Sequence, residues 1–362
     1  MRKFLPLALI CMLLCGCGSQ ESPETQPPAT TGAATEATIP TESTTAPTEP
    51  EVIIYRHPLT GEILDAPYTK RPVAVSTGNT RAAMPQMGIS YADLLLEMEE
   101  EGGVTRFMAV YTQYEQASAI GPIRSTRTFF NNAAVSFNAP LVHCGGSVRG
   151  IVGYHDLTGS KISPWEHIDE QYNGKYFYRD QQRLSDGYAT EHCLFITGEK
   201  LAAAMAAKEY ATEEAWDLGL QFREDALTGG SAANNVTVSF LGGKKTGFQY
   251  DSATKLYKAS QYGSALIDGI NGDQLAFKNI LVLTTAQSHK SEGRYVRSYY
   301  DMVGQGEGYL MCDGQMITLR WERESLEEPF RFTDANGNPI TLGVGKTYMA
   351  IVSTKATAPK CE

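Results

Sequence analysis

The sequence predicts an α+β fold, in which a mixed α/β N-terminal domain is followed by a smaller, mostly antiparallel β C-terminal domain. In the first half, strand-like apolar runs alternate with helix-like runs, one of them rich in alanine. In the second half, short strand-like runs are separated by turn signals such as Asp-Gly and Asn-Gly. Beyond its first 50 residues the 362-residue chain is long enough for two domains of ordinary size.

The amino terminus has the pattern of a lipoprotein signal peptide. Arg2 and Lys3 precede an apolar run over residues 4–14, which is too short to span a bilayer comfortably. Leu14-Cys15-Gly16-Cys17 then matches a lipobox, although Cys15 stands where Ala or Ser is more usual. We therefore expect residues 1–16 to be removed and Cys17 to carry the lipid; an ordinary secretion signal is the alternative.

Residues 17–50 are predicted to be a disordered tether. After Cys17 this segment consists largely of Thr, Pro, Ala, Ser and Glu, with no Lys, Arg or aromatic residue. Such a composition buries too little apolar surface to offset the entropy of ordering the chain. The expected location is the extracytoplasmic face of the cell membrane, with the lipid as the attachment and the folded body held away from the surface.

The α/β domain is assigned to residues 51–225. Residues 72–75 form a predicted strand, and residues 94–101 and 104–112 a predicted hairpin joined at Gly102-Gly103, with Glu99 opposite Arg106. Residues 129–137 and 199–209 are predicted helices, and residues 139–144 a buried strand.

The β domain is assigned to residues 226–362, after a Gly-rich interruption that begins near Arg223. Its predicted strands cover residues 236–241, 247–250, 256–260, 279–285, 308–312, 315–322, 330–333 and 347–352. Strands of this length and spacing favour a small antiparallel sandwich or barrel.

Charge and cysteine content exclude several classes of function. Without Arg2 and Lys3, 29 basic residues face 41 acidic ones, a net charge of about −12, so nonspecific nucleic-acid binding is not expected. The cysteines Cys144, Cys193, Cys312 and Cys361 form no C-x-x-C pair. A Cys144–Cys193 disulfide and free buried thiols both remain open, and we expect no cofactor.

The main candidate site is the arginine-rich segment over residues 119–127. Arg124, Ser125 and Arg127 precede a predicted helix start, and Arg106 lies on the preceding strand. Guanidinium groups, a hydroxyl and helix-start amides suit an anion or phosphate. The alternative is structural ion pairing with the nearby acids, of which Asp93 and Glu97 are the ones we place in the candidate site.

Two further segments are candidates for binding. Residues 143–147 combine His143, the glycine pair Gly145 and Gly146, and Ser147 at the end of a predicted strand, where a backbone can approach a ligand closely. Cys144 is the less favoured candidate for a nucleophile, because His143 next to it points to the opposite face. The aromatic and arginine cluster over residues 176–183 adds Arg179 as a sugar or peptide contact. His143, His155, His167 and His192 lie in the same predicted domain and leave metal binding as a less favoured alternative. No metal is expected, since no H-x-x-x-H or H-E-x-x-H spacing occurs.

Several motifs resemble those of the YerB-like lipoprotein family. They include residues 71–75, 88–93, 101–111, 120–125, 142–147 and 177–180, and in the second half residues 308–314, Trp321 and residues 336–350. Glu191-His192-Cys193 departs from the Pro-His-Asn expected in relatives. The resemblance covers nearly everything after Arg71 and implies a two-domain envelope lipoprotein, but no reaction.

The order strand, turn, Arg-Ser-x-Arg and helix is also similar to the core of LytR-CpsA-Psr ligases, over about forty residues. The favoured function is therefore a noncatalytic lipoprotein that binds an anionic or glycan wall component, with phosphate-containing and peptide ligands as further candidates. The alternatives are a transferase or hydrolase acting on polyprenyl-pyrophosphate-linked cell-wall precursors, and an extracytoplasmic scaffold for another envelope protein.

Overall fold

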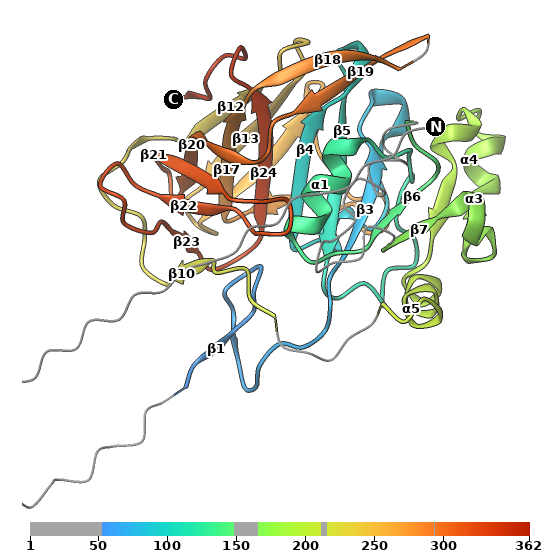
Figure 1. The fold of residues 1–362 in the computed structure, drawn as a ribbon, viewed down its shortest axis with the longest axis horizontal. Helices are drawn as coiled ribbons and strands as arrows, with labels where there is room; N and C mark the ends of the chain where they lie inside the picture. The colour runs from blue at the N-terminus through green and yellow to red at the C-terminus, as the bar shows by residue number, and fades with distance from the viewer. Residues whose placement is uncertain (1–52, 148–165, 211–215, 293) are drawn as a thin grey trace, which may run out of the picture. The chain divides into compact units, whose positions relative to one another are not determined.

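A mixed sheet of 11 strands forms the centre of the molecule in the computed structural model (Figure 1). The structure describes residues 53–147, 166–210, 216–292 and 294–362; the predicted signal peptide, Cys17 and the tether lie outside the described residues. In spatial order the strands are β11 (Ser231–Ala232), β21 (Gln315–Arg323), β20 (Gly304–Cys312), β17 (Asn279–Thr285), β24 (Thr347–Ser353), β4 (Leu94–Glu99), β5 (Thr105–Tyr111), β3 (Val73–Gly78), β6 (Leu141–His143) and β7 (His167–Asp169), with β22 (Arg331–Thr333) paired to β21.

The central strands are apolar on both sides because both faces of this sheet are covered. Neighbouring residues such as Leu95 and Leu96 therefore belong to different core clusters. On one face, helix α1 (Thr128–Ser136) lies over β3, β4 and β5, and its Phe129 and Phe130 pack among the apolar side chains of these strands (Figure 1). β24 pairs with β4 in parallel, so both halves of the sequence contribute strands to one sheet.

The other face of the central sheet packs against a second sheet of six strands. These are β15 (Ser264–Ala265), β14 (Leu256–Gln261), β13 (Lys245–Asp251), β12 (Asn235–Ser239) and β25 (Lys360–Cys361), with β16 (Ala276–Phe277) paired to β14. Alternate residues of β12 and β14, such as Val236, Val238 and Tyr257, are buried in the shared core. Burial of every second residue is typical of strands that have one face in the core.

The remaining elements are short. Strand pairs are formed by β1 (Tyr55–Arg56) with β2 (Ile63–Leu64), β8 (Phe177–Arg179) with β9 (Leu194–Ile196), β10 (Gln221–Arg223) with β23 (Thr341–Gly343), and β18 (Gln287–Glu292) with β19 (Tyr295–Tyr300). The other α-helices of the described residues are α3 (Glu170–Asn173), α4 (Gln181–Ser185) and α5 (Gly198–Ala207). None of the helices in the described part of the chain is long and apolar enough to cross a membrane.

The predicted fold class is confirmed: the helices of the described residues end by Ala207, and the part of the chain after them is mostly antiparallel strand. The register predicted for the hairpin at Gly102-Gly103 was wrong by one residue. Met98, and not Glu99, lies opposite Arg106. The reason is a longer connection, in which Glu101–Gly103 form a 3-10 turn and both glycines adopt positive φ. The domain boundary at residues 225–226 stays a prediction.

Candidate functional site

The candidate site lies where parallel strands of the central sheet end. β3 runs parallel to β6 and β6 parallel to β7, while β3 and β4 are both antiparallel to β5. The carboxyl ends of β3, β4, β6 and β7 therefore share one edge, together with the start of β5. In open α/β sheets this edge is the usual position of a ligand.

Two of the predicted segments meet at this edge. The amide of Cys144 donates to the carbonyl of Arg124 at 3.1 Å, and the amide of Thr126 to the carbonyl of Gly145 at 3.0 Å. The amide of Ser147 donates in turn to the carbonyl of Thr126 at 3.3 Å. Residues 124–127 and 144–147 thus lie side by side, which places Ser125 next to the glycine pair at Gly145 and Gly146.

Gly145 occupies a position that favours glycine. Its φ is +61°, in the left-handed region, and a Cβ there would lie 2.8 Å from Nε2 of Gln171. The neighbour at this position is a side chain of the first turn after β7, and the predicted close approach of a ligand to the backbone stays a prediction.

Arg106 and Arg127 are held by acidic neighbours. Arg106 is 4% exposed, and its Nη2 lies 2.6 Å from Oε1 of Glu100 while Nη1 donates to the carbonyl of Ser125. Arg127 approaches Glu101 with both Nε and Nη2, at 3.0 and 2.8 Å from Oε2. Burial lowers the pKa of Arg106 to about 10, so it is still cationic at neutral pH. These two arginines therefore form structural ion pairs, the alternative to anion binding that the sequence left open.

Arg124 and Arg179 are the other two arginines of the candidate site, and both donate to backbone carbonyls. Arg124 donates to the carbonyl of Glu191 at 3.0 Å, and Arg179 to the carbonyl of Thr190 at 2.9 Å. Two guanidinium groups therefore bind consecutive carbonyls of one 3-10 turn. The side chain of Arg124 is 22% exposed, and its carboxylate partner Glu191 is 62% exposed, so that ion pair is weakened by water.

Asp93 and Glu97 were grouped with the arginines by sequence, and the structure places them elsewhere. Oδ2 of Asp93, just before β4, accepts hydrogen bonds from the amide and hydroxyl of Thr112 at 2.8 and 2.7 Å. Glu97, inside β4, is fully buried in a hydrogen-bond network with Lys244 and Tyr348. The carboxylates beside Arg106 and Arg127 are those of Glu100 and Glu101, which follow β4 and so lie at its carboxyl end.

Glu101 provides a pH-dependent test of this ion-pair cluster. Burial raises the pKa of Glu101, but the hydrogen bond and charge of Arg127, the amide of Ser298 and the charge of Arg297 together hold it below its ordinary value of 4.5. A carboxyl whose pKa is lower in the folded protein stabilises the fold above the unfolded-state pKa, and that contribution disappears as pH falls through the folded value.

We therefore expect Glu101→Gln to lower the urea midpoint at pH 7, with a smaller difference from wild type once the pH is below about 4. The control is Glu191→Gln, whose exposed ion pair predicts little change at either pH. An equal loss for Glu101→Gln at both pH values would contradict the assigned role of its charge.

His143 lies beside two side chains of β7. Its Nε2 is 3.0 Å from Nδ1 of His167, and its Nδ1 is 3.8 Å from Oδ1 of Asp169. Burial lowers the pKa of both histidines, that of His167 to about 4, so both imidazoles are neutral at pH 7. Linear spacing had not connected these three residues, because 23 positions separate His143 from His167 in the sequence.

Cys144 does not have the environment of a nucleophile. Its thiol donates to Oε2 of Glu170 at 3.3 Å, and burial together with Glu170 raises its pKa to about 11. A nucleophilic cysteine requires the opposite shift. All four cysteines of the described residues, Cys144, Cys193, Cys312 and Cys361, are free thiols.

Arg183, from the aromatic and arginine cluster, is structural. It is buried, it donates to the carbonyls of Ala83, Pro85 and His192, and it lies over the rings of Tyr188 and Phe195. These contacts join residues 83–85 to the segment that carries Arg179, so Arg183 supports this side of the site.

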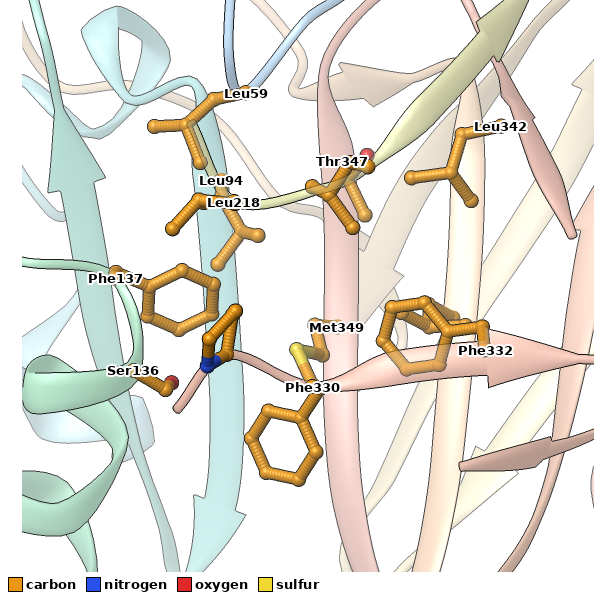
Figure 2. Close-up of a pocket in the computed structure, with 13 residues that line it drawn as sticks. Leu59, Leu94, Ser136, Phe137, Leu218, Phe330, Phe332, Leu342, Thr347 and Met349 are labelled. Atoms are coloured by element: carbon orange, nitrogen blue, oxygen red, sulfur yellow. The ribbon is translucent and has the colours of Figure 1, made fainter. Parts of the chain in front are cut away.

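A cavity on the other side of the core is too small to be a ligand site. Figure 2 shows apolar side chains such as Leu94, Phe137, Phe330 and Met349 around it. Its volume is about 20 Å³, enough for roughly one water molecule, and its walls offer almost no polar partner. We regard it as a packing gap.

Comparison with known proteins identifies relatives over most of the chain. A family model described as "Protein of unknown function (DUF3048) N-terminal domain" matches residues 59–211, and the corresponding C-terminal domain model matches residues 236–349. A protein of Bacillus subtilis (strain 168) described as "Putative lipoprotein YerB" is 27% identical over 300 residues, which are 82% of this chain and 85% of that protein. The crystal structure of YerB protein from Bacillus subtilis matches with a TM-score of 0.67 and 26% identity, over 82% of this chain and 96% of that one.

Proposed function

The chain belongs to the YerB-like lipoprotein family, and from this premise we propose that it is an extracytoplasmic lipoprotein that binds an anionic or glycan wall component. Two features support the location: the relative is described as a lipoprotein, and Cys17 ends a lipobox that is followed by a Thr- and Pro-rich segment. A diacylglyceride on Cys17 would hold the protein at the membrane.

The ligand contact is assigned to Arg124, Ser125 and Arg179. The observation that carries this assignment is the pairing of Arg124 and Arg179 with consecutive backbone carbonyls, while Arg106 and Arg127 use their charge on Glu100 and Glu101. A carbonyl does not cancel the charge of a guanidinium group. Arg124 also pairs with the carboxylate of Glu191, but that carboxylate is 62% exposed and water weakens the pair. Arg124 and Arg179 therefore keep positive charge and donors that suit a phosphate, a carboxylate or a sugar hydroxyl.

A binding role is favoured over a catalytic one. A catalytic site needs a nucleophile or a general base within hydrogen-bond reach of the reacting group. Cys144, the one candidate nucleophile that the sequence suggested, has a raised pKa, and its partner is the carboxylate of Glu170, whose charge disfavours a thiolate. The alternative is a transferase that acts on polyprenyl-pyrophosphate-linked precursors, and the test below also measures that activity.

We expect the double variant Arg124→Gln, Arg179→Gln to bind isolated cell walls at least about tenfold more weakly than the wild type. Each charged hydrogen bond contributes about 1.5–3 kcal/mol. The measurement is cosedimentation of the full chain with cell-wall fragments, before and after extraction of their phosphate polymers. Loss of binding on extraction identifies an anionic polymer, and retention identifies the glycan.

The matched control is Arg331→Gln, since Arg331 is an arginine with a side chain 62% exposed on β22. Wild-type binding by the double variant would overturn the assignment. Turnover of a polyprenyl-pyrophosphate-linked precursor by the wild type, lost in the double variant, would replace the binding role with the transferase.

A further inference from the structure

We propose that His143, His167 and Asp169 form a binding site for one divalent transition-metal ion, with zinc as the metal that best fits the ligands. Sequence spacing had predicted no metal, so the inference depends on contacts that only the folded sheet creates. It is independent of the ligand assigned to Arg124 and Arg179.

The register of two parallel strands brings the three side chains to one face. His143 is paired with Asp169 across β6 and β7. His167 and Asp169 are two residues apart on β7, and side chains at this spacing point to the same side of a strand. One nitrogen or oxygen atom from each of the three residues lies within 4.8 Å of the others.

The separations are close to those of a zinc site. Two nitrogens that each lie about 2.0–2.1 Å from a tetrahedral zinc ion are about 3.3 Å apart. Nε2 of His143 and Nδ1 of His167 are 3.0 Å apart, so an ion would need a slightly longer separation and a rotation of the two nearly parallel rings that points both lone pairs at it. Two histidines and a carboxylate are a common zinc ligand set that leaves a fourth position for water.

The surrounding hydrogen bonds orient the ligands as metal sites require. Nδ1 of His143 lies 2.8 Å from the carbonyl of Gly145, and a proton there leaves the lone pair on Nε2 facing His167. Metal-bound histidines typically donate their other N–H to such a carbonyl. Oδ1 of Asp169 is held by the amides of Gly145 and Gln171, at 2.8 and 3.2 Å.

The second oxygen of Asp169 provides the independent observation. Asp169 is 1% exposed, and its Oδ2 has no hydrogen-bond partner among the described residues. A buried carboxylate oxygen without a partner is destabilising and is rare in native proteins. A cation that contacted Oδ2 would satisfy it.

A metal ion here would join the ends of β6 and β7. It would also immobilise the glycine pair at Gly145 and Gly146, which lies beside Ser125. The ion would thus add rigidity to the edge of the sheet that the proposed function uses.

The test is titration of the full chain, purified in detergent and stripped with a chelator, against ZnCl₂ in competition with a zinc-responsive dye. We expect one equivalent to bind, and His167→Gln and Asp169→Asn each to weaken binding at least about tenfold. His289→Gln, a histidine outside the cluster, and the double variant Arg124→Gln, Arg179→Gln should bind zinc as the wild type does.

Binding of Co²⁺ in place of zinc is measured on the wild type alone, so it tests the site even if a ligand variant fails to fold. Visible bands of tetrahedral Co²⁺, without a thiolate charge-transfer band, support the site. A thiolate band, wild-type affinity in both folded ligand variants, or no binding of either metal by the wild type would overturn it.

Discussion

Lys244→Met is expected to lower the free energy of unfolding by about 3–5 kcal/mol, because it leaves a buried carboxylate without its cation. Nζ of Lys244 donates to Oε1 of Glu97 at 2.8 Å, to Thr246 at 2.5 Å and to Gln261 at 2.9 Å. Glu97 is fully buried, and its other oxygen accepts hydrogen bonds from Thr246 and Tyr348, each at 2.7 Å. Urea denaturation of the full chain measures the loss.

Two controls separate the charge from the packing. Glu97→Gln combined with Lys244→Met removes both charges, and we expect it to recover part of the lost stability, since the uncompensated charge is gone. Lys258→Met, in an exposed pair with Asp251, should cost less than about 1 kcal/mol. A Lys244→Met variant as stable as wild type would show that Glu97 is not held as an ion in the folded protein.

Cys17→Ala is expected to abolish both lipid labelling and membrane retention. Two acyl chains on one glyceride anchor a protein stably, at about 0.8 kcal/mol for each buried CH₂ group, whereas the protein without them has no attachment that the sequence predicts. Metabolic labelling with a fatty acid, followed by fractionation of the cells, measures both effects.

Cys15→Ala is the matched control, because Cys15 lies two residues before Cys17 and Ala is common at that position of a lipobox. This variant should be labelled as the wild type is. If the wild type carries no label, or if Cys17→Ala keeps it, the predicted anchor is wrong, and the proposed location loses its support from the sequence.

Much of the secondary structure could be predicted from local patterns. The predicted helices over residues 129–137 and 199–209 correspond to α1 and α5, and each predicted strand of the second half overlaps an observed one. The prediction missed the β18–β19 hairpin, whose first strand contains no apolar residue and so shows no apolar alternation. It also missed β7, which has three residues and too little sequence to show a period.

The site was only partly predictable, for a different reason. Ser125 and the glycine pair at Gly145 and Gly146 were predicted in two separate candidate segments, and the structure places these segments side by side. The acidic partners were predicted wrongly. The turn is one residue longer than predicted, so the pairing of β4 with β5 moves by one residue and Arg106 lies opposite Met98. The carboxylates that reach Arg106 and Arg127 are those of Glu100 and Glu101. His167 and Asp169 had no local signal at all.

The sequence by itself determined what depends on near neighbours and on composition: the acidic charge, the two predicted helices and most of the longer strands. The export signal and the lipid anchor stay its predictions. Only the tertiary structure decided which side chains meet. The pairing of β24 with β4 joins the two halves in one sheet, and the pairing of β6 with β7 brings His143 to Asp169. Parallel pairing joins segments that lie far apart along the chain, and its register is set by packing on both faces of the sheet, which no local pattern records.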